Sequence, residues 1–295
     1  MPQSAPESAA FKTVGRISCR FHRLRDRGEL GLIAYVTAGD PSLDASEKIV
    51  LAAAEAGADV IELGVPFSDP VADGPTIQRA SERALRHGTT LAGVIELVRR
   101  LRARTDTPLV LFSYFNPILQ MGLDRFAQSA SAAGADGVLA TDLTPEEAAA
   151  YCAALGAHGL DTIFLAAPTT TDPRLAKIVG CSSGFLYLIS RTGVTGAQEA
   201  FPEDVPALAR RVRQLTKLPL AVGFGISQPA HVSILGGIAD AAVVGSVLVS
   251  EIERVATAEA AAAAVADRIG ILKRAAREGV SVREHSPHPS AEAER

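Results

Sequence analysis

Eight short apolar runs, separated by segments with helical spacing, restrict the fold of this 295-residue chain more than any other feature. Short runs that are apolar throughout predict buried strands, whereas apolar residues three or four positions apart predict one face of a helix. Buried strands alternating with helices indicate a parallel sheet covered on its outer face. Eight such units predict a single α/β domain with the (β/α)8 TIM barrel architecture. The predicted strands are 32–37, 59–63, 109–113, 137–141, 162–166, 185–189, 220–223 and 241–244.

A weak internal repeat supports this count of units. The tetrapeptide AGAD occupies 56–59 and 133–136, and GIAD occupies 237–240. Each copy lies between the predicted end of a helix and the predicted start of a strand. Any one copy is unsurprising in an alanine-rich chain, but three at equivalent places indicate repeated βα units.

Further segments are expected outside the eight units. Extra helices are predicted on the outer ring or at its start, over 11–29, 90–104 and 258–277. Residues 281–295 are dominated by Ser, Pro, His, Glu and Arg, which predicts a disordered tail. We therefore expect one barrel domain over 1–280, with 1–10 flexible.

Composition excludes several classes of partner. The formal net charge is −4 and the isoelectric point is near 5.9, so there is no basic field to attract nucleic acid or an anionic membrane. No apolar run reaches the roughly 18 residues of a membrane span, and the first 15 residues lack the apolar core of a signal peptide. The three cysteines form no C-x-x-C pair. These features predict a cytoplasmic protein.

Candidate acids and bases are concentrated in IELGVPFSDPVADGPTIQ, which occupies 61–78. Active sites of such barrels lie at the C-terminal ends of the strands, where Glu62 ends a predicted strand. Side chains alternate along a strand, so Glu62 shares a face with Val60 and points into the barrel mouth, where apolar walls raise a carboxyl pKa. Alternatively, Glu62 forms a hydrogen bond with loop backbone.

The loop after this strand offers two further carboxylates. Asp73 either orients a donor group on a substrate or caps the helix predicted to begin at Pro75. Asp69 lies in the middle of the loop and is expected to face solvent or a partner.

Two absences from the predicted strand ends restrict the chemistry. None of the five lysines falls there, which argues against an imine with a carbonyl substrate. The six histidines also avoid these ends and show no metal-ligand spacing. Bond cleavage in this barrel would therefore use carboxylate acid–base catalysis on a substrate that supplies its own electron sink.

Glycines follow the last three predicted strands, where backbone N–H groups can approach an anion closely. The ends of strands seven and eight are where this fold binds phosphate, although either glycine cluster alone is also typical of an ordinary turn. The candidate phosphate-binding segments are 195–196, 223–227 and 244–246. Aromatic residues are placed to line a ring-binding pocket or simply to fill the core, namely Tyr35, Phe112, Tyr187 and Phe224.

Five motifs in chain order resemble the tryptophan synthase alpha subunit family, over roughly 11–277. They are YVTAGDP, IELGVPFSDPVADGPTIQ, LISRTGVTGA, GFGIS and VVGS. The resemblance implies a lyase that cleaves indole-3-glycerol phosphate to indole and glyceraldehyde 3-phosphate by a retro-aldol reaction. It implies that Glu62 is the catalytic acid and base, and that Asp73 holds the indole N–H. It implies phosphate binding by Gly196, Gly225, Gly245 and Ser246, and substrate contact for Tyr187, Thr195 and Phe224.

The same resemblance implies an α2β2 heterotetramer. Pyridoxal phosphate is then expected only in the β partner, with none in this chain, and Asp69 and Arg191 are expected in loops at the partner face. Tyr35 departs from the family pattern, where phenylalanine is common. Two alternatives stay open: a lyase that acts alone and releases indole, and a non-catalytic barrel that only binds phosphate.

Overall fold

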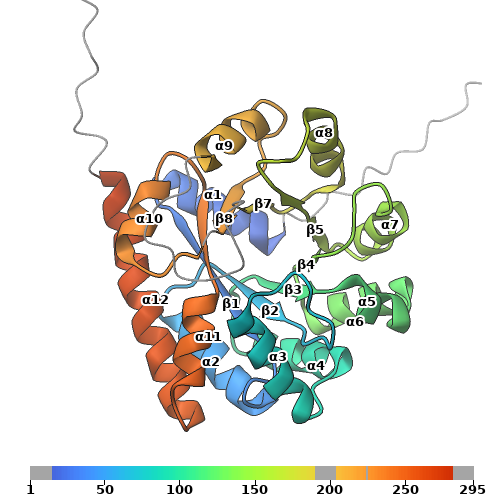
Figure 1. Ribbon diagram of the computed structural model, residues 1–295, viewed down its shortest axis with the longest axis vertical. Helices are drawn as coiled ribbons and strands as arrows, with labels where there is room; N and C mark the ends of the chain where they lie inside the picture. Colours follow the sequence, from blue (N-terminus) through green and yellow to red (C-terminus); the bar gives the residue numbers. More distant parts are fainter. Residues whose placement is uncertain (1–14, 190–203, 224, 282–295) are drawn as a thin grey trace, which may run out of the picture.

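The computed structural model describes residues 15–189, 204–223 and 225–281. Within these residues, nine parallel strands form one sheet in the order β5-β4-β3-β2-β1-β9-β8-β7-β6. The sheet curls into a barrel surrounded by helices (Figure 1), which confirms the predicted architecture. The strands are β1 (Gly31–Thr37), β2 (Val60–Gly64), β3 (Leu109–Ser113), β4 (Gly137–Ala140), β5 (Asp161–Ile163), β6 (Leu165–Ala166), β7 (Leu186–Ile189), β8 (Leu220–Gly223) and β9 (Ala241–Val244).

The fifth predicted strand, 162–166, is divided in two in the structure. Its first part, β5, pairs with β4, whereas its second part, β6, pairs with β7. Phe164 separates the two parts and packs its side chain into the outer core. The two edge strands of the sheet, β5 and β6, are therefore consecutive in the chain. Together they form the fifth of the eight predicted strand units.

Twelve helices occur in the described part of the chain. They are α1 (Arg16–Asp26), α2 (Leu43–Glu55), α3 (Pro75–Arg86), α4 (Leu91–Arg102), α5 (Phe115–Met121), α6 (Leu123–Ala133), α7 (Ala149–Ala157), α8 (Asp172–Cys181), α9 (Val205–Arg213), α10 (Pro229–Leu235), α11 (Ser246–Glu253) and α12 (Ala258–Ser281). The helix that begins the chain is shorter than the predicted 11–29, of which 11–14 lie outside the described residues. The tail predicted over 281–295 also lies outside them, except for Ser281, which ends α12.

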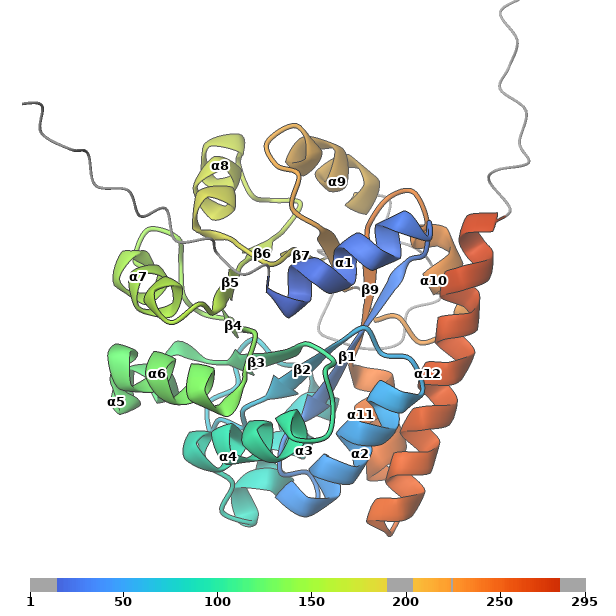
Figure 2. The same cartoon turned by 180° about the vertical axis from the view of Figure 1, so that it is seen from behind.

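Two helices follow β2 and two follow β9, and packing shows which of them complete the ring. Helix α4 packs against α2 and α6, and α12 packs against α2 and α10, so both belong to the ring (Figures 1 and 2). Helices α3 and α11 instead pack against each other and against β1. The helices added to the ring are therefore α3 and α11. The sequence had instead suggested 90–104 and 258–277, which correspond to α4 and α12.

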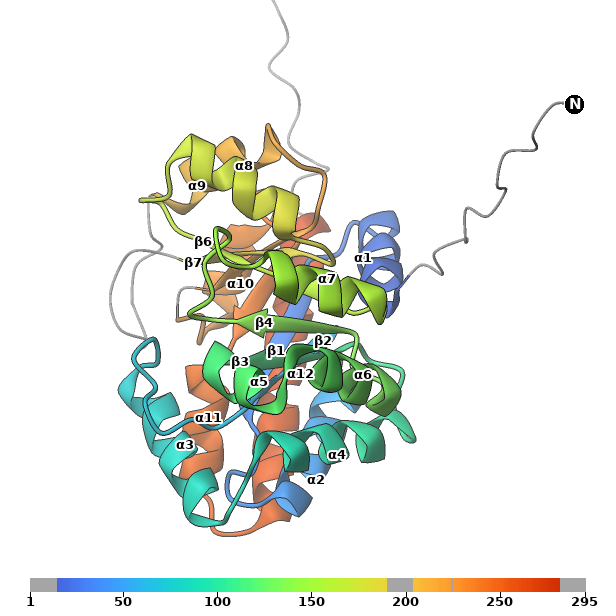
Figure 3. The same ribbon diagram turned by 90° about the vertical axis from the view of Figure 1, so that its right-hand side faces the viewer.

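Side chains of the strands alternate between the barrel interior and the helices. On β2, Val60 belongs to the interior cluster, whereas Ile61 and Leu63 pack against the helices. Helix α1 lies across the N-terminal end of the barrel, opposite α3 and α11 (Figures 2 and 3). It buries Phe21 in the interior, where its ring centroid is 5.9 Å from that of Phe185. One end of the barrel is thus closed by an apolar plug.

The aspartates of the internal repeat have a shared structural role at this closed end. Each precedes one strand and accepts a hydrogen bond from a backbone N–H in the first two residues of the neighbouring strand. The pairs are Asp59 with Leu32 at 2.8 Å, Asp136 with Leu109 at 2.8 Å and Asp240 with Leu220 at 2.7 Å. A carboxylate therefore completes the strand pairing where the ladder would otherwise leave a donor unpaired.

These carboxylates are neutralised by cations from distant parts of the chain. Lys273 of α12 lies 2.6 Å from Asp59, and both side chains are almost fully buried. Arg102 lies 2.7 Å from Asp136, which Arg16 of α1 also contacts at 3.0 Å. The first and last described helices are thereby joined to the closed end of the barrel.

We expect Asp59→Asn to destabilise the protein by about 3 kcal/mol, because it removes the nearer counter-charge of the buried Lys273 ammonium and leaves that ammonium with Glu29 at 3.7 Å. Asparagine keeps an oxygen that can accept the hydrogen bond from the Leu32 N–H. The loss of stability therefore measures the ion pair and not this hydrogen bond. Denaturant unfolding measures this. As a control, Glu259→Gln removes the exposed ion pair with Lys48 and should leave the midpoint unchanged. Equal midpoints for the two variants would contradict this role for Asp59.

Candidate active site

Glu62 lies within β2 at the mouth of the barrel, between β1 and β3. Its register partners are Tyr35 on one side and Val110 on the other. The residue is fully buried, and neither carboxylate oxygen has a hydrogen-bond partner among the described atoms. Burial raises the pKa of Glu62 to about 8. The alternative of a glutamate bonded to loop backbone is therefore not seen in the described part of the chain.

Asp73 lies in the loop between β2 and α3 and is half-buried. Its Oδ2 accepts a hydrogen bond from the Tyr114 hydroxyl at 3.2 Å, and that hydroxyl accepts one from the Ala72 N–H at 2.9 Å. Burial raises the pKa of Asp73 to about 6, and the hydrogen bond from Tyr114 opposes this rise. Helix α3 has Gly74 at its N-cap with no side-chain cap. Asp73 therefore does not cap the helix, and its carboxylate is held by a tyrosine.

Two tyrosines lie close to these carboxylates. Burial raises the pKa of Tyr35, and the negative charges of Asp73 and Glu62 raise it further. Burial and then the Glu62 charge likewise raise the pKa of Tyr187. The ring of Tyr35 meets that of Phe112 edge to face, with centroids 5.2 Å apart. The structure thus brings Tyr35, Phe112 and Tyr187 together around Glu62, as a ring-binding pocket requires.

Glycines at the ends of two strands make room for the tyrosine hydroxyls. A Cβ on Gly64 of β2 would lie 2.1 Å from the Tyr35 hydroxyl oxygen, and one on Gly223 of β8 would lie 2.4 Å from that of Tyr187. No side chain is tolerated at either distance. Gly223, the first glycine of the GFG motif, therefore leaves space for the Tyr187 side chain. The sequence did not reveal this role.

The candidate phosphate residues that the structure describes lie at the ends of β8 and β9. Gly225 has a positive φ of 82°, which glycine adopts without strain. Gly245 is the N-cap of α11 and Ser246 is its first residue, so unpaired backbone N–H groups of the first helical turn are presented here. Four site candidates lie outside the described residues, namely Arg191, Thr195, Gly196 and Phe224.

The loop that carries Asp73 also reaches the surface. Asp69 is exposed, and its carboxylate accepts a hydrogen bond from the Ser68 hydroxyl at 2.5 Å. Val71 is 87% exposed. The middle of this loop is thus directed outward, as expected, while Asp73 faces inward.

A cavity of about 350 Å³ lies beside the mouth, between the loops that follow β4 and β6. Its lining includes Leu165 of β6, whose side chain packs against the interior cluster, and Arg174 of α8. Among the described residues, no group of three or more His, Cys, Asp or Glu side chains is arranged to hold a metal ion. No described helix combines the length and the apolar character of a membrane span.

Comparison with known proteins assigns the family. A family model described as tryptophan synthase alpha chain matches residues 21–277. The chain belongs to the tryptophan synthase alpha chain family.

Individual alpha chains and solved structures agree with this membership. The tryptophan synthase alpha chain of Solibacter usitatus is 54% identical over 247 residues, which cover 84% of this chain and 92% of that protein. A structure of Mycobacterium tuberculosis tryptophan synthase matches with a TM-score of 0.83 and 37% identity, covering 90% of this chain and 99% of that one. A tryptophan synthase complex from Pyrococcus furiosus matches with a TM-score of 0.76 and 39% identity, covering 83% and 97%.

Tyr114 contacts Asp73 in this site but was not predicted from the sequence as a site residue. It directly follows β3, so its place at a strand end was visible, but nothing local indicated that it would contact Asp73. The two residues are 41 positions apart and meet only because β2 and β3 are neighbours in the barrel.

The pKa of Glu62 should make stability depend on pH. The unfolded chain releases this proton near pH 4.5 and the folded protein near pH 8, so stability falls as pH rises between these values. Glu62→Gln removes this dependence. From pH 5 to pH 8 the variant should gain on the order of 4 kcal/mol relative to the wild type, and the gain should level off above about pH 9, where Glu62 is ionised in both states. Denaturant unfolding across this range measures the gain, and a constant difference would show that Glu62 is not protonated in the folded protein.

Proposed function

We propose that Glu62 and Asp73 together carry out the reaction of the tryptophan synthase alpha chain family, the cleavage of indole-3-glycerol phosphate to indole and glyceraldehyde 3-phosphate. The observation that carries this proposal is the inequality of two neighbouring carboxyl groups. Burial raises the pKa of Glu62 to about 8 and that of Asp73 only to about 6. Near neutral pH, Glu62 therefore holds a proton that it can donate, while Asp73 is mostly ionised.

The reaction needs one proton to move between two atoms of the substrate. Protonated Glu62 gives its proton to C3 of the indole ring, and the ring nitrogen becomes positively charged. Ionised Asp73 accepts a hydrogen bond from the ring N–H and stabilises that charge. The Glu62 carboxylate then removes the proton of the hydroxyl on the adjoining glycerol carbon. The carbon–carbon bond breaks, its electrons return to the ring, an aldehyde forms, and Glu62 is again protonated.

The position of positive charge in this scheme explains why a lysine or a metal is not required. The protonated indole ring accepts the electrons of the breaking bond, as an imine does in other aldolases. Lys273, the buried lysine in the described part of the chain, lies at the closed end of the barrel with Asp59. The chain's own contribution is therefore proton transfer and charge stabilisation.

The remaining pocket residues are proposed to orient the substrate. Tyr35, Phe112 and Tyr187 would contact the indole ring, since they surround Glu62 in the structure. Thr195 and Phe224 are proposed to complete this pocket. The phosphate would be bound by backbone N–H groups at Gly196, Gly225, Gly245 and Ser246, of which the last two begin α11.

The alpha chain is proposed to work within an α2β2 complex, one domain over 1–280 contributing the barrel. The Pyrococcus furiosus match is itself a tryptophan synthase complex. Pyridoxal phosphate would belong to the β subunit, and this chain would use no cofactor. Asp69 and Arg191 are proposed for the partner face, which the exposure of Asp69 supports. We place the complex in the cytoplasm, in keeping with the acidic charge and the few cysteines of the chain.

Glu62→Gln and Asp73→Asn should each lower kcat by about 100-fold or more, because each removes one of the two carboxyl functions. Indole release from indole-3-glycerol phosphate measures this, with far-ultraviolet circular dichroism as the test of folding. Asp69→Asn on the same loop is the control and should retain cleavage by the isolated chain. Near-normal turnover in either site variant would remove that residue from the mechanism.

The same assay with and without β subunit separates the remaining functions. Stimulation by β subunit is expected of an alpha chain. Equal rates would indicate a lyase that acts alone, and no cleavage under either condition would indicate a barrel that only binds phosphate.

Tyr114→Phe should shift the acidic limb of the pH–rate profile to higher pH. The hydrogen bond from Tyr114 lowers the pKa of Asp73, so its loss lets that pKa rise above about 6 and reduces the ionised fraction. Tyr151→Phe is a matched control, since it removes a buried hydroxyl that donates to the Val138 carbonyl at 3.3 Å, away from the site. An unchanged acidic limb in Tyr114→Phe would mean that Asp73 does not set it.

A further inference from the structure

Helices α3 and α11 both begin at the active site. Helix α3 starts directly after Asp73, with Gly74 as its N-cap, and α11 starts with Ser246 after its N-cap, Gly245. The two helices pack against each other outside the ring. Their relative position therefore sets the spacing between the Asp73 carboxylate and the backbone N–H groups at the start of α11.

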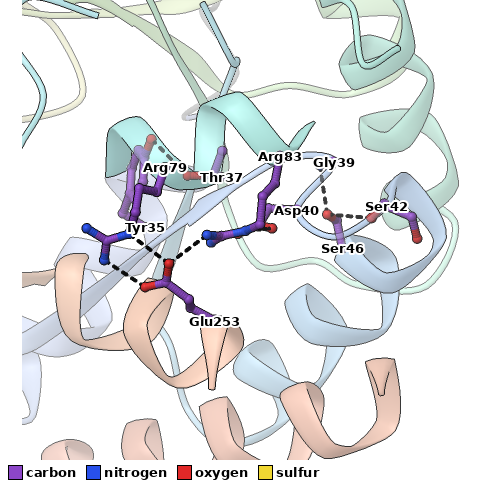
Figure 4. A network of polar contacts seen from close by, with 9 residues as sticks. All are labelled: Tyr35, Thr37, Gly39, Asp40, Ser42, Ser46, Arg79, Arg83 and Glu253. Atoms are coloured by element: carbon purple, nitrogen blue, oxygen red, sulfur yellow. Dashed lines mark hydrogen bonds and ion pairs between the residues drawn. The ribbon is translucent and has the colours of Figure 1, made fainter. Parts of the chain in front are cut away.

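A carboxylate of α11 is held by two arginines of α3 (Figure 4). The Arg79 guanidinium donates from Nε and Nη2 to the two oxygens of Glu253, at 2.8 Å each. Arg83 donates from Nη1 to Oε1 of the same carboxylate at 2.7 Å. Glu253 is thus bound at both oxygens by side chains from the neighbouring helix.

Arg83 extends this network to the loop after β1. Its Nε and Nη2 donate to the two oxygens of Asp40, at 2.8 Å each, and Asp40 is only 1% exposed. The loop is itself anchored, because the Gly39 N–H donates to the Ser46 hydroxyl at 2.9 Å (Figure 4). Three elements that reach the active site, namely the β1 loop, α3 and α11, are therefore joined by two carboxylates and two guanidinium groups.

An apolar layer lies beneath this network and faces the site. Ile77 and Ala80 of α3 pack with Val249 of α11 against Tyr35. Such contacts hold the helices together but tolerate sliding, because dispersion and apolar burial have little directional preference. A two-pronged contact between arginine and carboxylate fixes distance and orientation. Hydrogen bonds from Arg79 and then Arg83 lower the pKa of Glu253 to about 2, so it stays ionised at working pH.

We propose that Glu253 is a positioning residue that fixes the spacing between Asp73 and the phosphate-binding start of α11. The inference rests on the proposed function, in which one substrate carries an indole ring at one end and a phosphate at the other. When the Asp73 carboxylate and the N–H groups of α11 are held at the correct spacing, binding of one end of the substrate favours binding of the other. When the spacing varies, each group still binds its own end, but the affinity for the whole substrate gains little from the linkage. Loss of Glu253 should therefore weaken linked ligands more than their separate halves.

The experiment compares Glu253→Gln with the wild type by calorimetric titration of three probes. The linked probe is 3-(indol-3-yl)propyl phosphate, which lacks the reacting hydroxyls and cannot be cleaved, and its halves are indole and propyl phosphate. The variant should bind the linked probe about tenfold more weakly and each half within about twofold of the wild type. The kcat/KM for indole-3-glycerol phosphate should fall with the affinity for the linked probe.

Glu251→Gln is the matched control on the same helix. Glu251 pairs with Arg268 of α12 at 2.6 Å, and among the described residues it forms no hydrogen bond or ion pair with α3. This variant loses an α11 ion pair of similar exposure and should bind all three probes as the wild type does.

The outcomes are distinct for each hypothesis. Equal weakening of all three probes in Glu253→Gln, or no weakening of any, would overturn the positioning role. If thermal unfolding shows that this variant does not fold, Arg79→Lys keeps the charge without the two-pronged contact and should show the same selective loss. If the wild type binds the linked probe no better than propyl phosphate, the proposed two-anchor site itself fails, whatever the variants do.

Discussion

The burial of the Glu62 carboxyl group without a hydrogen-bond partner in the described structure is the constraint on which the site depends. Burial raises its pKa to about 8, because removal from solvent disfavours the charged carboxylate, so the group is kept protonated near neutral pH. Such a group opposes folding as pH rises, and the surrounding barrel must supply the compensating stability. The acid that we propose to protonate the substrate carbon is therefore obtained at the expense of local stability.

The two ends of the barrel use acidic residues in opposite ways. At the closed end, Asp59 and Asp136 complete strand pairing and are neutralised by Lys273 and Arg102. At the open end, the Glu62 carboxyl group has no hydrogen-bond partner among the described residues, and Asp73 is bound by the neutral hydroxyl of Tyr114. Paired carboxylates hold the strands in register, while Glu62 is the acid proposed for the reaction. Both depend on the same parallel sheet.

The two helices that lie outside the ring, α3 and α11, are proposed to hold the two ends of the substrate. Each starts at a group proposed to bind one end of indole-3-glycerol phosphate, and each is held to the other by Glu253 and the arginines of α3. A barrel provides strand ends at fixed positions, but the loop that carries Asp73 needs separate support. The charged network above the apolar layer at Tyr35 provides it.

Local sequence determined the strands, the face of β2 on which Glu62 lies and the family, because alternation along a strand and a long contiguous motif are properties of neighbouring residues. It did not determine the division of the fifth strand at Phe164 or the identity of the helices outside the ring, since both depend on which elements pack together. Nor could it pair Tyr114 with Asp73, or Arg79 with Glu253 across 174 positions. These contacts arise only when closure of the barrel brings distant segments side by side, and burial then gives identical residue types different pKa values and different roles.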